Sequence, residues 1–269
     1  MPAPRSNIVI YPYKQSSESA IAIKKAIEAL KLRRHPRVLM VRSDGSYVPQ
    51  HDDVVFGWGA GARPQFFGKV PQFNNYIAVM NSVSKITSFR NFNNAGVVTP
   101  EWTIFQDVAN RWLNAGEIVL SRTSIDGKGG EGIHINHPDL DEYVKDALLY
   151  VKFYRRIREL RVHVFGAEVL YSQEKRLKLS IKSNVKNMIL KAEGESWNFI
   201  WNPPLTSQER NFAINAINAN ELDFGAVDMI DTQSGPLVLE TNTCPELGKD
   251  GARMYARAFV RTADEMRRV

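Results

Sequence analysis

The segment Leu222–Leu247 reads LDFGAVDMIDTQSGPLVLETNTCPEL and is the most informative part of the sequence. Two apolar runs, at about 223–230 and 237–241, predict β-strands, because both are rich in residues that favour strands. The polar residues between them predict a turn that includes Asp231 and Gly235. The segment is therefore expected to form a β-hairpin.

Three side chains in this hairpin carry ligand oxygens: Asp228, Glu240 and Asn242. Strand alternation places Glu240 and Asn242 on one face, and a hairpin centred near Ser234 would place Asp228 opposite Glu240. A register one residue different would separate these groups. Such hard oxygen ligands suit Mg²⁺ or Mn²⁺, which also takes water and substrate phosphates as ligands. The alternative is a pair of solvated acids on an exposed hairpin.

Composition narrows the class of protein. The 269 residues are 43% hydrophobic, which is enough for two or three small lobes with packed cores. No apolar run approaches the length of a membrane span, so no membrane partner is expected. The polar first residues and the single cysteine, Cys244, favour a reducing cytoplasm. The net charge of +6 favours anionic partners such as ATP, an acidic substrate or nucleic acid, although no nucleic-acid-binding motif supports the last.

The first sixty residues predict a parallel α/β unit. A β-branched run at 7–11 is followed by an amphipathic segment at 16–30 and by two further strand-like runs, at 37–41 and 53–56. Strand, helix and strand at this spacing are typical of an open parallel sheet. The glycine-rich sequence FGWGAG at 56–61 then predicts a close-approach loop rather than a dinucleotide fingerprint, because a proline follows where a helix would have to open.

The next segments predict a helix and a glycine-rich loop. Residues 81–95 have helical spacing, with Lys85 early in the helix. The strand expected at 117–122 leads into SIDGKGGEG at 124–132. A loop of this kind can fold over phosphates by using its backbone N–H groups and Lys128. It is not a Walker loop, and an ordinary hairpin loop is the alternative.

The middle of the chain alternates helix and strand signals. We expect a helix at 138–147, a strand at 148–154 and a solvated basic turn at 155–158. The sequence ELRVHVF at 159–165 alternates polar and apolar residues, as a half-buried strand does. His163 has no metal-like partner at matching spacing, so we interpret it as a structural or surface residue.

Five of these segments resemble, in order, the ATP-grasp superfamily of carboxylate–amine ligases. They are SVSKITSFRNFNNAGVVTP, DGKGGEG, LLYVKFY, ELRVHVFG, and GAVDMI followed by LVLETN. The resemblance is closest to the branch of glutamate-adding and glutathione-type ligases and of small phage-encoded ligases. It implies a mixed α/β and α+β fold. A Rossmann-like pre-ATP-grasp domain would span 1–78, an ATP-grasp N-lobe with a glycine-rich lid 79–148, and a C-lobe with the metal site 149–269.

The resemblance also implies roles for individual residues. Asp228, Glu240 and Asn242 would bind the metal, and Arg161 and Lys128 would act on the reacting groups. The residues implied in nucleotide binding are Lys85, Arg122, Gly127, Lys128, Gly129, Gly130, Tyr150, Val151, Lys152, Phe153, Glu159 and Lys178. Two of them depart from the family pattern, because Arg122 stands where lysine is usual and Lys152 where glutamate is common. Base recognition is therefore expected to depend on main-chain groups.

The implied reaction is ATP-dependent ligation of a carboxylate to an amine through an acyl phosphate, with release of ADP and phosphate. Candidate substrates include an amino acid, a peptide, a polyamine and a modified base, and a homodimer is a candidate assembly. The short chain resembles phage-encoded members, which would place it in the host cytoplasm. One alternative is a non-catalytic nucleotide- or nucleic-acid-binding protein on the same scaffold. Another is a kinase that stops at the acyl phosphate or phosphorylates a hydroxyl.

Overall fold

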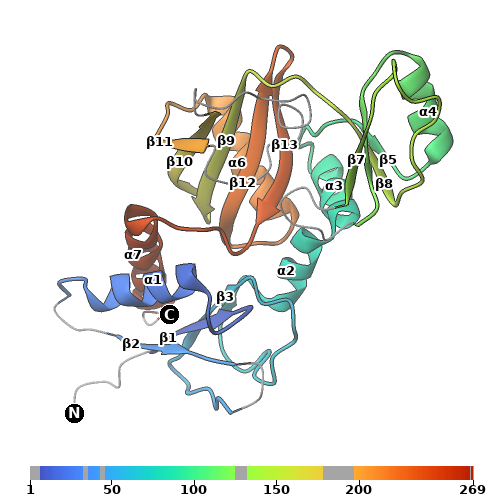
Figure 1. The fold of residues 1–269 in the computed structure, drawn as a ribbon. Helices are drawn as coiled ribbons and strands as arrows, with labels where there is room; N and C mark the ends of the chain where they lie inside the picture. The colour runs from blue at the N-terminus through green and yellow to red at the C-terminus, as the bar shows by residue number, and fades with distance from the viewer. Residues whose placement is uncertain are drawn as a thin grey trace, which may run out of the picture.

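Three β-sheets organise the protein in the computed structural model (Figure 1). The structure describes residues 7–32, 36–42, 46–124, 132–177, 197–266 and 268. The sheets follow one another along the chain, and helices pack between and against them. This mixed architecture agrees with the fold class expected from the sequence.

The first sheet is a parallel α/β unit, as predicted. Its strands are β1 (Asn7–Pro12), β2 (Arg37–Met40), β3 (Val54–Trp58) and β4 (Gln72–Phe73), in the order β2-β1-β3-β4. Every pairing is parallel, and β3 is buried along its whole length. Helix α1 (Glu18–Glu28) begins at Ser17, whose hydroxyl accepts from the Ala20 amide. The continuous apolar character of β1 and β3 reflects burial on both faces of the sheet.

The second sheet is a small antiparallel one. It contains β5 (Trp102–Thr103), β8 (Leu149–Lys152), β6 (Val119–Arg122) and β7 (Ile133–Asn136), with α4 (Gln106–Asn114) packed nearby. The helix predicted at 138–147 is wrong, because turns and irregular chain occupy this segment. The Asp141 carboxylate accepts from the His137 amide at 2.7 Å. Side chains outside the segment accept hydrogen bonds from further backbone N–H groups of the segment. These N–H groups therefore do not form the backbone hydrogen bonds of an α-helix.

The third sheet has five antiparallel strands. They are β9 (Arg158–Phe165), β10 (Glu168–Leu177), β11 (Trp197–Trp201), β12 (Phe224–Thr232) and β13 (Gly235–Asn242), in the order β11-β10-β9-β12-β13. Helix α6 (Ser207–Ala219) covers one face, and its Ala213 and Ile217 join the core with Val162 and Val227. A capping box between Thr206 and Glu209 begins this helix. The opposite face carries the polar residues described below.

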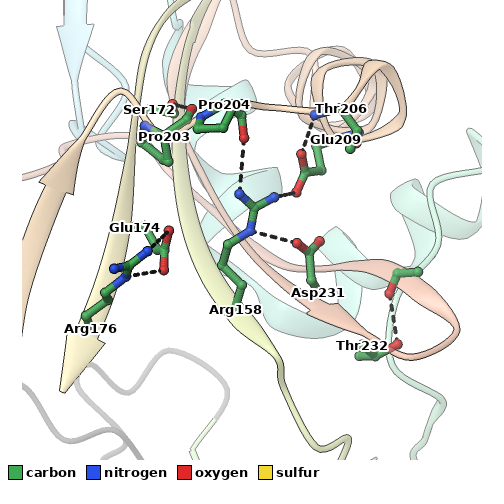
Figure 2. A network of polar contacts seen from close by, with 11 residues as sticks. Arg158, Ser172, Glu174, Arg176, Pro203, Pro204, Thr206, Glu209, Asp231 and Thr232 are labelled. Carbon is green, nitrogen blue, oxygen red and sulfur yellow. Dashed lines mark hydrogen bonds and ion pairs between the residues drawn. The ribbon is translucent and has the colours of Figure 1, made fainter.

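A charged cluster joins the start of α6 to the third sheet (Figure 2). Arg158 pairs with Glu209 and donates from Nε to the Asp231 carboxylate at 2.9 Å and from Nη1 to the Pro204 carbonyl at 3.1 Å. The Glu209 side chain is only 1% exposed. The predicted solvated turn at 155–158 is therefore wrong for Arg158, because buried carboxylates require a charged partner.

The helix predicted at 81–95 is two helices. Helix α2 (Tyr76–Val83) ends at Ser84, and α3 (Lys85–Asn94) begins directly after it. Ser84 has an extended backbone, and its hydroxyl accepts from the Thr87 amide, so one residue stops the first helix and caps the second. The break makes Lys85 the first residue of α3.

The last helix, α7 (Lys249–Met266), packs on the first sheet beside α1 (Figure 1). Phe259 stacks on Phe56 with ring centroids 4.0 Å apart, and Tyr255 meets Trp58 edge-on. The two ends of the described chain thus share one hydrophobic core. In the part of the chain that the structure describes, no helix combines the length and apolar character needed to cross a bilayer.

Asn74 connects the first sheet to the third. It is buried in a left-handed backbone conformation, with φ of 50°. Its Oδ1 accepts from the Asp223 and Phe224 amides at 2.7 and 3.1 Å, and its Nδ2 donates to the Phe224 carbonyl at 2.8 Å. These bonds lie at the start of β12, so they position the β12–β13 hairpin against the amino-terminal unit.

We expect Asn74→Ala to lower the free energy of unfolding by about 2–4 kcal/mol, because buried backbone groups at Asp223 and Phe224 lose their partners. Chemical denaturation measures the change. The exposed Asn93→Ala on α3 is the matched control and should shift stability by less than about 0.5 kcal/mol. Equal stability of wild type and Asn74→Ala would contradict this role.

Candidate functional site

The polar face of the third sheet holds a row of charged residues. Arg161 on β9 pairs in register with Asp228 on β12, and Asp228 pairs with Glu240 on β13. Opposed residues share a face. Asn242 lies two residues beyond Glu240 on β13, opposite Ala226, and so belongs to the same face. The predicted pairing of Asp228 with Glu240 is confirmed.

A β-bulge produces this register. The hairpin turn is Gln233–Ser234, because Thr232 already pairs with Gly235; Asp231 lies in β12, so its predicted place in the turn is wrong. From such a tight turn, a regular ladder would put Leu239 opposite Asp228. The register shifts between Asp228 and Met229, which leaves Leu239 as the extra residue of β13 and returns Glu240 to the face of Asp228.

Cations surround both carboxylates. Arg161 donates from Nε and Nη2 to the two oxygens of Asp228, at 2.7 and 2.8 Å, in a bidentate ion pair. Lys85, at the start of α3, pairs with Glu240. Arg122 at the end of β6 also interacts with Glu240; burial lowers the pKa of its guanidinium, and the Glu240 charge acts in the opposite direction. Three cations from three elements thus meet two carboxylates, which leaves the cluster net positive.

Glu159 occupies the next position on the same face of β9. Its carboxylate lies 3.6 Å from Nη1 of Arg156 and 3.7 Å from Nζ of Lys175. The structure therefore places the residue predicted to bind ribose beside the charged row, between two cations.

The side chains of β8, the strand predicted to bind adenine, are engaged in core packing and in an ion pair. Tyr150 is buried in the core beneath α4, and its hydroxyl accepts from the Ala147 amide at 3.0 Å. Val151 belongs to the main core, and Lys152 pairs with Glu101 at 2.8 Å. The Phe153 amide donates to the Ile118 carbonyl. Contact of the base with other main-chain groups of this segment stays the expectation from sequence.

Several predicted residues lie outside the described part of the chain. They are Gly127, Lys128, Gly129 and Gly130 of the glycine-rich loop, together with Lys178. Their proposed roles therefore rest on sequence alone.

Residues that the sequence did not single out as functional complete this face. His163 is buried, with Nδ1 3.1 Å from the Tyr255 hydroxyl and Nε2 3.4 Å from Oε1 of Gln173. Gln173 pairs in register with Arg161 and so extends the charged row by one strand. Burial, and secondarily the charge of Arg161, lowers the pKa of His163 to about 3, so its ring is neutral. The alternation of side chains along β10 could have indicated that Gln173 lies on the polar face. Only the register between β10 and β9 places it next to Arg161.

The donor set suits a divalent metal. Asp228 and Glu240 are opposed, and the side-chain oxygen of Asn242 is oriented by a hydrogen bond from the Cys244 amide at 3.0 Å. A carboxylate offers about four acceptor positions, so its ion pair leaves capacity for a metal. Within the described ranges, no three His, Cys, Asp or Glu side chains converge. A metal here would therefore have two carboxylates and an amide as protein ligands and take the rest from phosphate and water, as Mg²⁺ does.

Comparisons with known proteins indicate the class of protein that this chain resembles. A family model described as the RimK-like ATP-grasp domain matches residues 148–257. A probable alpha-L-glutamate ligase of Vibrio parahaemolyticus is 26% identical over 249 residues, covering 80% of this chain and 78% of the relative. A ribosomal protein bS6–L-glutamate ligase of Escherichia coli is 24% identical over 265 residues, covering 88% and 85%.

Solved structures show the same fold. The ATP-grasp ligase PsnB, complexed with a phosphomimetic precursor, Mg and ADP, superimposes with a TM-score of 0.68 at 10% identity, covering 96% of this chain and 99% of that one. D-alanyl-alanine synthetase A of Vibrio cholerae gives 0.67 at 14% identity, covering 97% and 99%.

Residues 148–257 thus match the RimK-like ATP-grasp domain, and the chain as a whole has the ATP-grasp fold that its motifs predict. The predicted class of enzyme, an ATP-dependent ligase that joins a carboxylate to an amine, is also the class of these relatives and is confirmed.

The buried neutral His163 predicts an acid-dependent loss of stability. Its folded pKa lies below the unfolded value of about 6.5, so the unfolded chain binds the proton first and stability falls as pH drops below 6.5 towards 3. We expect this residue to account for about 2 kcal/mol of the stability lost between pH 7 and pH 5.

Denaturation of wild type and His163→Asn at both pH values measures this contribution, because asparagine does not titrate. The control is His51→Asn, which replaces a histidine whose side chain is fully exposed. A pH-dependent loss of the same size in His163→Asn and wild type would show that His163 is not its source.

Proposed function

We propose that the charged row is the catalytic centre of the ligase. A substrate carboxylate attacks the γ-phosphate of ATP to give an acyl phosphate and ADP. An amine then attacks the acyl carbon, phosphate leaves, and an amide bond remains. The observation that carries the proposal is the convergence of Lys85, Arg122 and Arg161 on Asp228 and Glu240.

We further propose that Asp228, Glu240 and Asn242 hold Mg²⁺. A bound Mg²⁺ would neutralise phosphate charge and orient the terminal phosphate for in-line attack. The donor chemistry of the three side chains supports the assignment, and the neighbour PsnB is described in complex with Mg and ADP.

The chain's own cations have distinct tasks in this scheme. Arg161, held in a fixed orientation by its bidentate pair with Asp228, places positive charge where the phosphoryl group is transferred. Lys85 and Arg122 bring charge from α3 and β6 to the Glu240 side of the row. We assign ribose binding to Glu159 and base binding to main-chain groups of residues 150–153. No side-chain nucleophile is needed for a reaction that depends on positioning and charge.

The further assignments are proposals of the same kind. Gly127, Gly129 and Gly130, with Lys128, would cover the triphosphate, and Lys178 would add a cation. The three lobes would span 1–78, 79–148 and 149–269. The protein would act in the cytoplasm, which is the host's if the chain is phage-encoded.

We propose a peptide or protein as one substrate and a small amine such as an amino acid as the other. One relative is named a ribosomal protein bS6–L-glutamate ligase. One structural neighbour is described with a precursor peptide and another with a leader and core peptide. These descriptions belong to those proteins, and they support the same substrate class for this chain.

The variants Asp228→Asn and Glu240→Gln should each reduce ADP formation by at least about 100-fold, because each removes a charge that a phosphate-bound metal requires. Coupled assays of ADP release over a panel of peptides and amino acids measure the effect. Melting curves by circular dichroism should show that both variants remain folded.

The matched control is Glu168→Gln, which removes a surface carboxylate of the same sheet that pairs with Arg261. It should keep wild-type turnover. Undiminished turnover in Asp228→Asn or Glu240→Gln would refute the metal assignment. Tight Mg-ATP binding by wild type without ADP release from any substrate would instead favour a non-catalytic nucleotide-binding protein.

A further inference from the structure

The outer edge of the third sheet presents two exposed aromatic side chains, Phe199 and Trp201 of β11. Their exposed fractions are 51% and 41%. They lie two residues apart on one strand and therefore share a face. Trp201 pairs in register with Gln173, and Phe199 pairs with Lys175.

This aromatic edge is continuous with the charged row. From Trp201 the register passes through Gln173 and Arg161 to Asp228. Paired residues across successive strands share a face, so the two aromatic side chains lie on the face that bears the proposed catalytic centre. At the edge of the sheet, the charged row therefore adjoins a surface formed by the two aromatic side chains.

Trp201 is held rigidly. Its ring stacks on Tyr171 with centroids 4.3 Å apart at 17°, and Tyr171 stacks in turn on the buried His163 at 4.0 Å and 14°. One side of the Trp201 ring is covered by this stack, and the side chain is still 41% exposed. A pre-oriented aromatic surface binds a ligand with little loss of conformational entropy.

We propose that Phe199 and Trp201 form a subsite for a substrate peptide, which binds an aromatic or large apolar side chain a few residues from the reacting group. This inference rests on the proposed ligase function and deepens it. Three strand spacings, about 14 Å, separate Trp201 from Asp228. An extended peptide rises about 3.3 Å per residue, so roughly four residues span the distance.

The charge along this path favours a peptide over a nucleic acid. Between Trp201 and Asp228, the described cations of this face pair with carboxylates: Arg161 with Asp228 at 2.7 Å, and Lys175 with Glu159 at 3.7 Å. A groove that follows a phosphate backbone needs a clear excess of positive charge. A balanced, polar surface with two aromatic side chains instead suits the amides and mixed side chains of a peptide.

Calorimetric binding of hexapeptides in the presence of Mg-ADP tests the proposal. The probes are glycine–serine hexapeptides ending in glutamate, either without phenylalanine or with one phenylalanine moved along positions one to five. Wild type should bind at least one phenylalanine peptide about tenfold more tightly than the peptide without it. Trp201→Ala should abolish this preference, and Phe199→Ala should reduce it.

Phe105→Ala is the matched control, because it removes an exposed aromatic side chain next to α4 on the second sheet. It should keep the preference, and all three variants should bind Mg-ADP like wild type. Failure of wild type to bind Mg-ADP would overturn the proposed function itself. Normal Mg-ADP binding without any phenylalanine preference, or a preference that survives in Trp201→Ala, would overturn only the peptide subsite. The peptide subsite would also be overturned if wild type bound a twelve-residue oligouridylate and Trp201→Ala abolished that binding, because that result would identify a nucleic-acid-binding surface.

Discussion

The ion pairs around Asp228 and Glu240 are the interactions on which the site depends. Two carboxylates opposed on adjacent strands repel one another and are costly to desolvate, so the arrangement requires positive charge close by. Arg161 supplies it from the same sheet and Lys85 from a helix outside the sheet. These pairs preorganise the row, and the charge of Arg122 near Glu240 adds a positive excess at that end, which suits a transferring phosphoryl group.

The rest of the fold can be understood as the means of bringing these charges together. The break at Ser84 directs the start of α3, with Lys85, towards β13, and the Ser82 hydroxyl bonds to the Thr241 side chain at 2.7 Å. Asn74 joins the first sheet to the start of β12. The helices and connections between the sheets thus contact β12 and β13, so the relative position of the sheets and the geometry of the charged row depend on one another.

Sequence reasoning succeeded where a pattern is local. The parallel unit and the capping box of α6 follow from periodicity and a short motif. It failed where tertiary contacts override local preference. Residues 81–95 have a continuous helical pattern, yet Ser84 caps a second helix. The bulge at Leu239 has no sequence signature, so the correct pairing was obtained from an incorrect turn.

Residues far apart in sequence were the hardest to predict. Arg158 belongs to a basic run that resembles a solvated turn, but buried Glu209, about fifty positions later, draws it into an ion pair. Gln173 and Trp201 join the face of the charged row only through the register of β10 with β9 and β11. Register depends on packing across the whole sheet, so no single segment could have revealed it.

The most direct test of the account is a crystal structure with Mg-ADP bound. The account predicts Mg²⁺ with oxygens of Asp228, Glu240 and Asn242 among its ligands, at about 2.0–2.1 Å for those it coordinates directly. It also predicts the terminal phosphate beside Arg161 and Lys85. Nucleotide and metal bound elsewhere, with the Arg161–Asp228 and Lys85–Glu240 pairs unchanged, would contradict it.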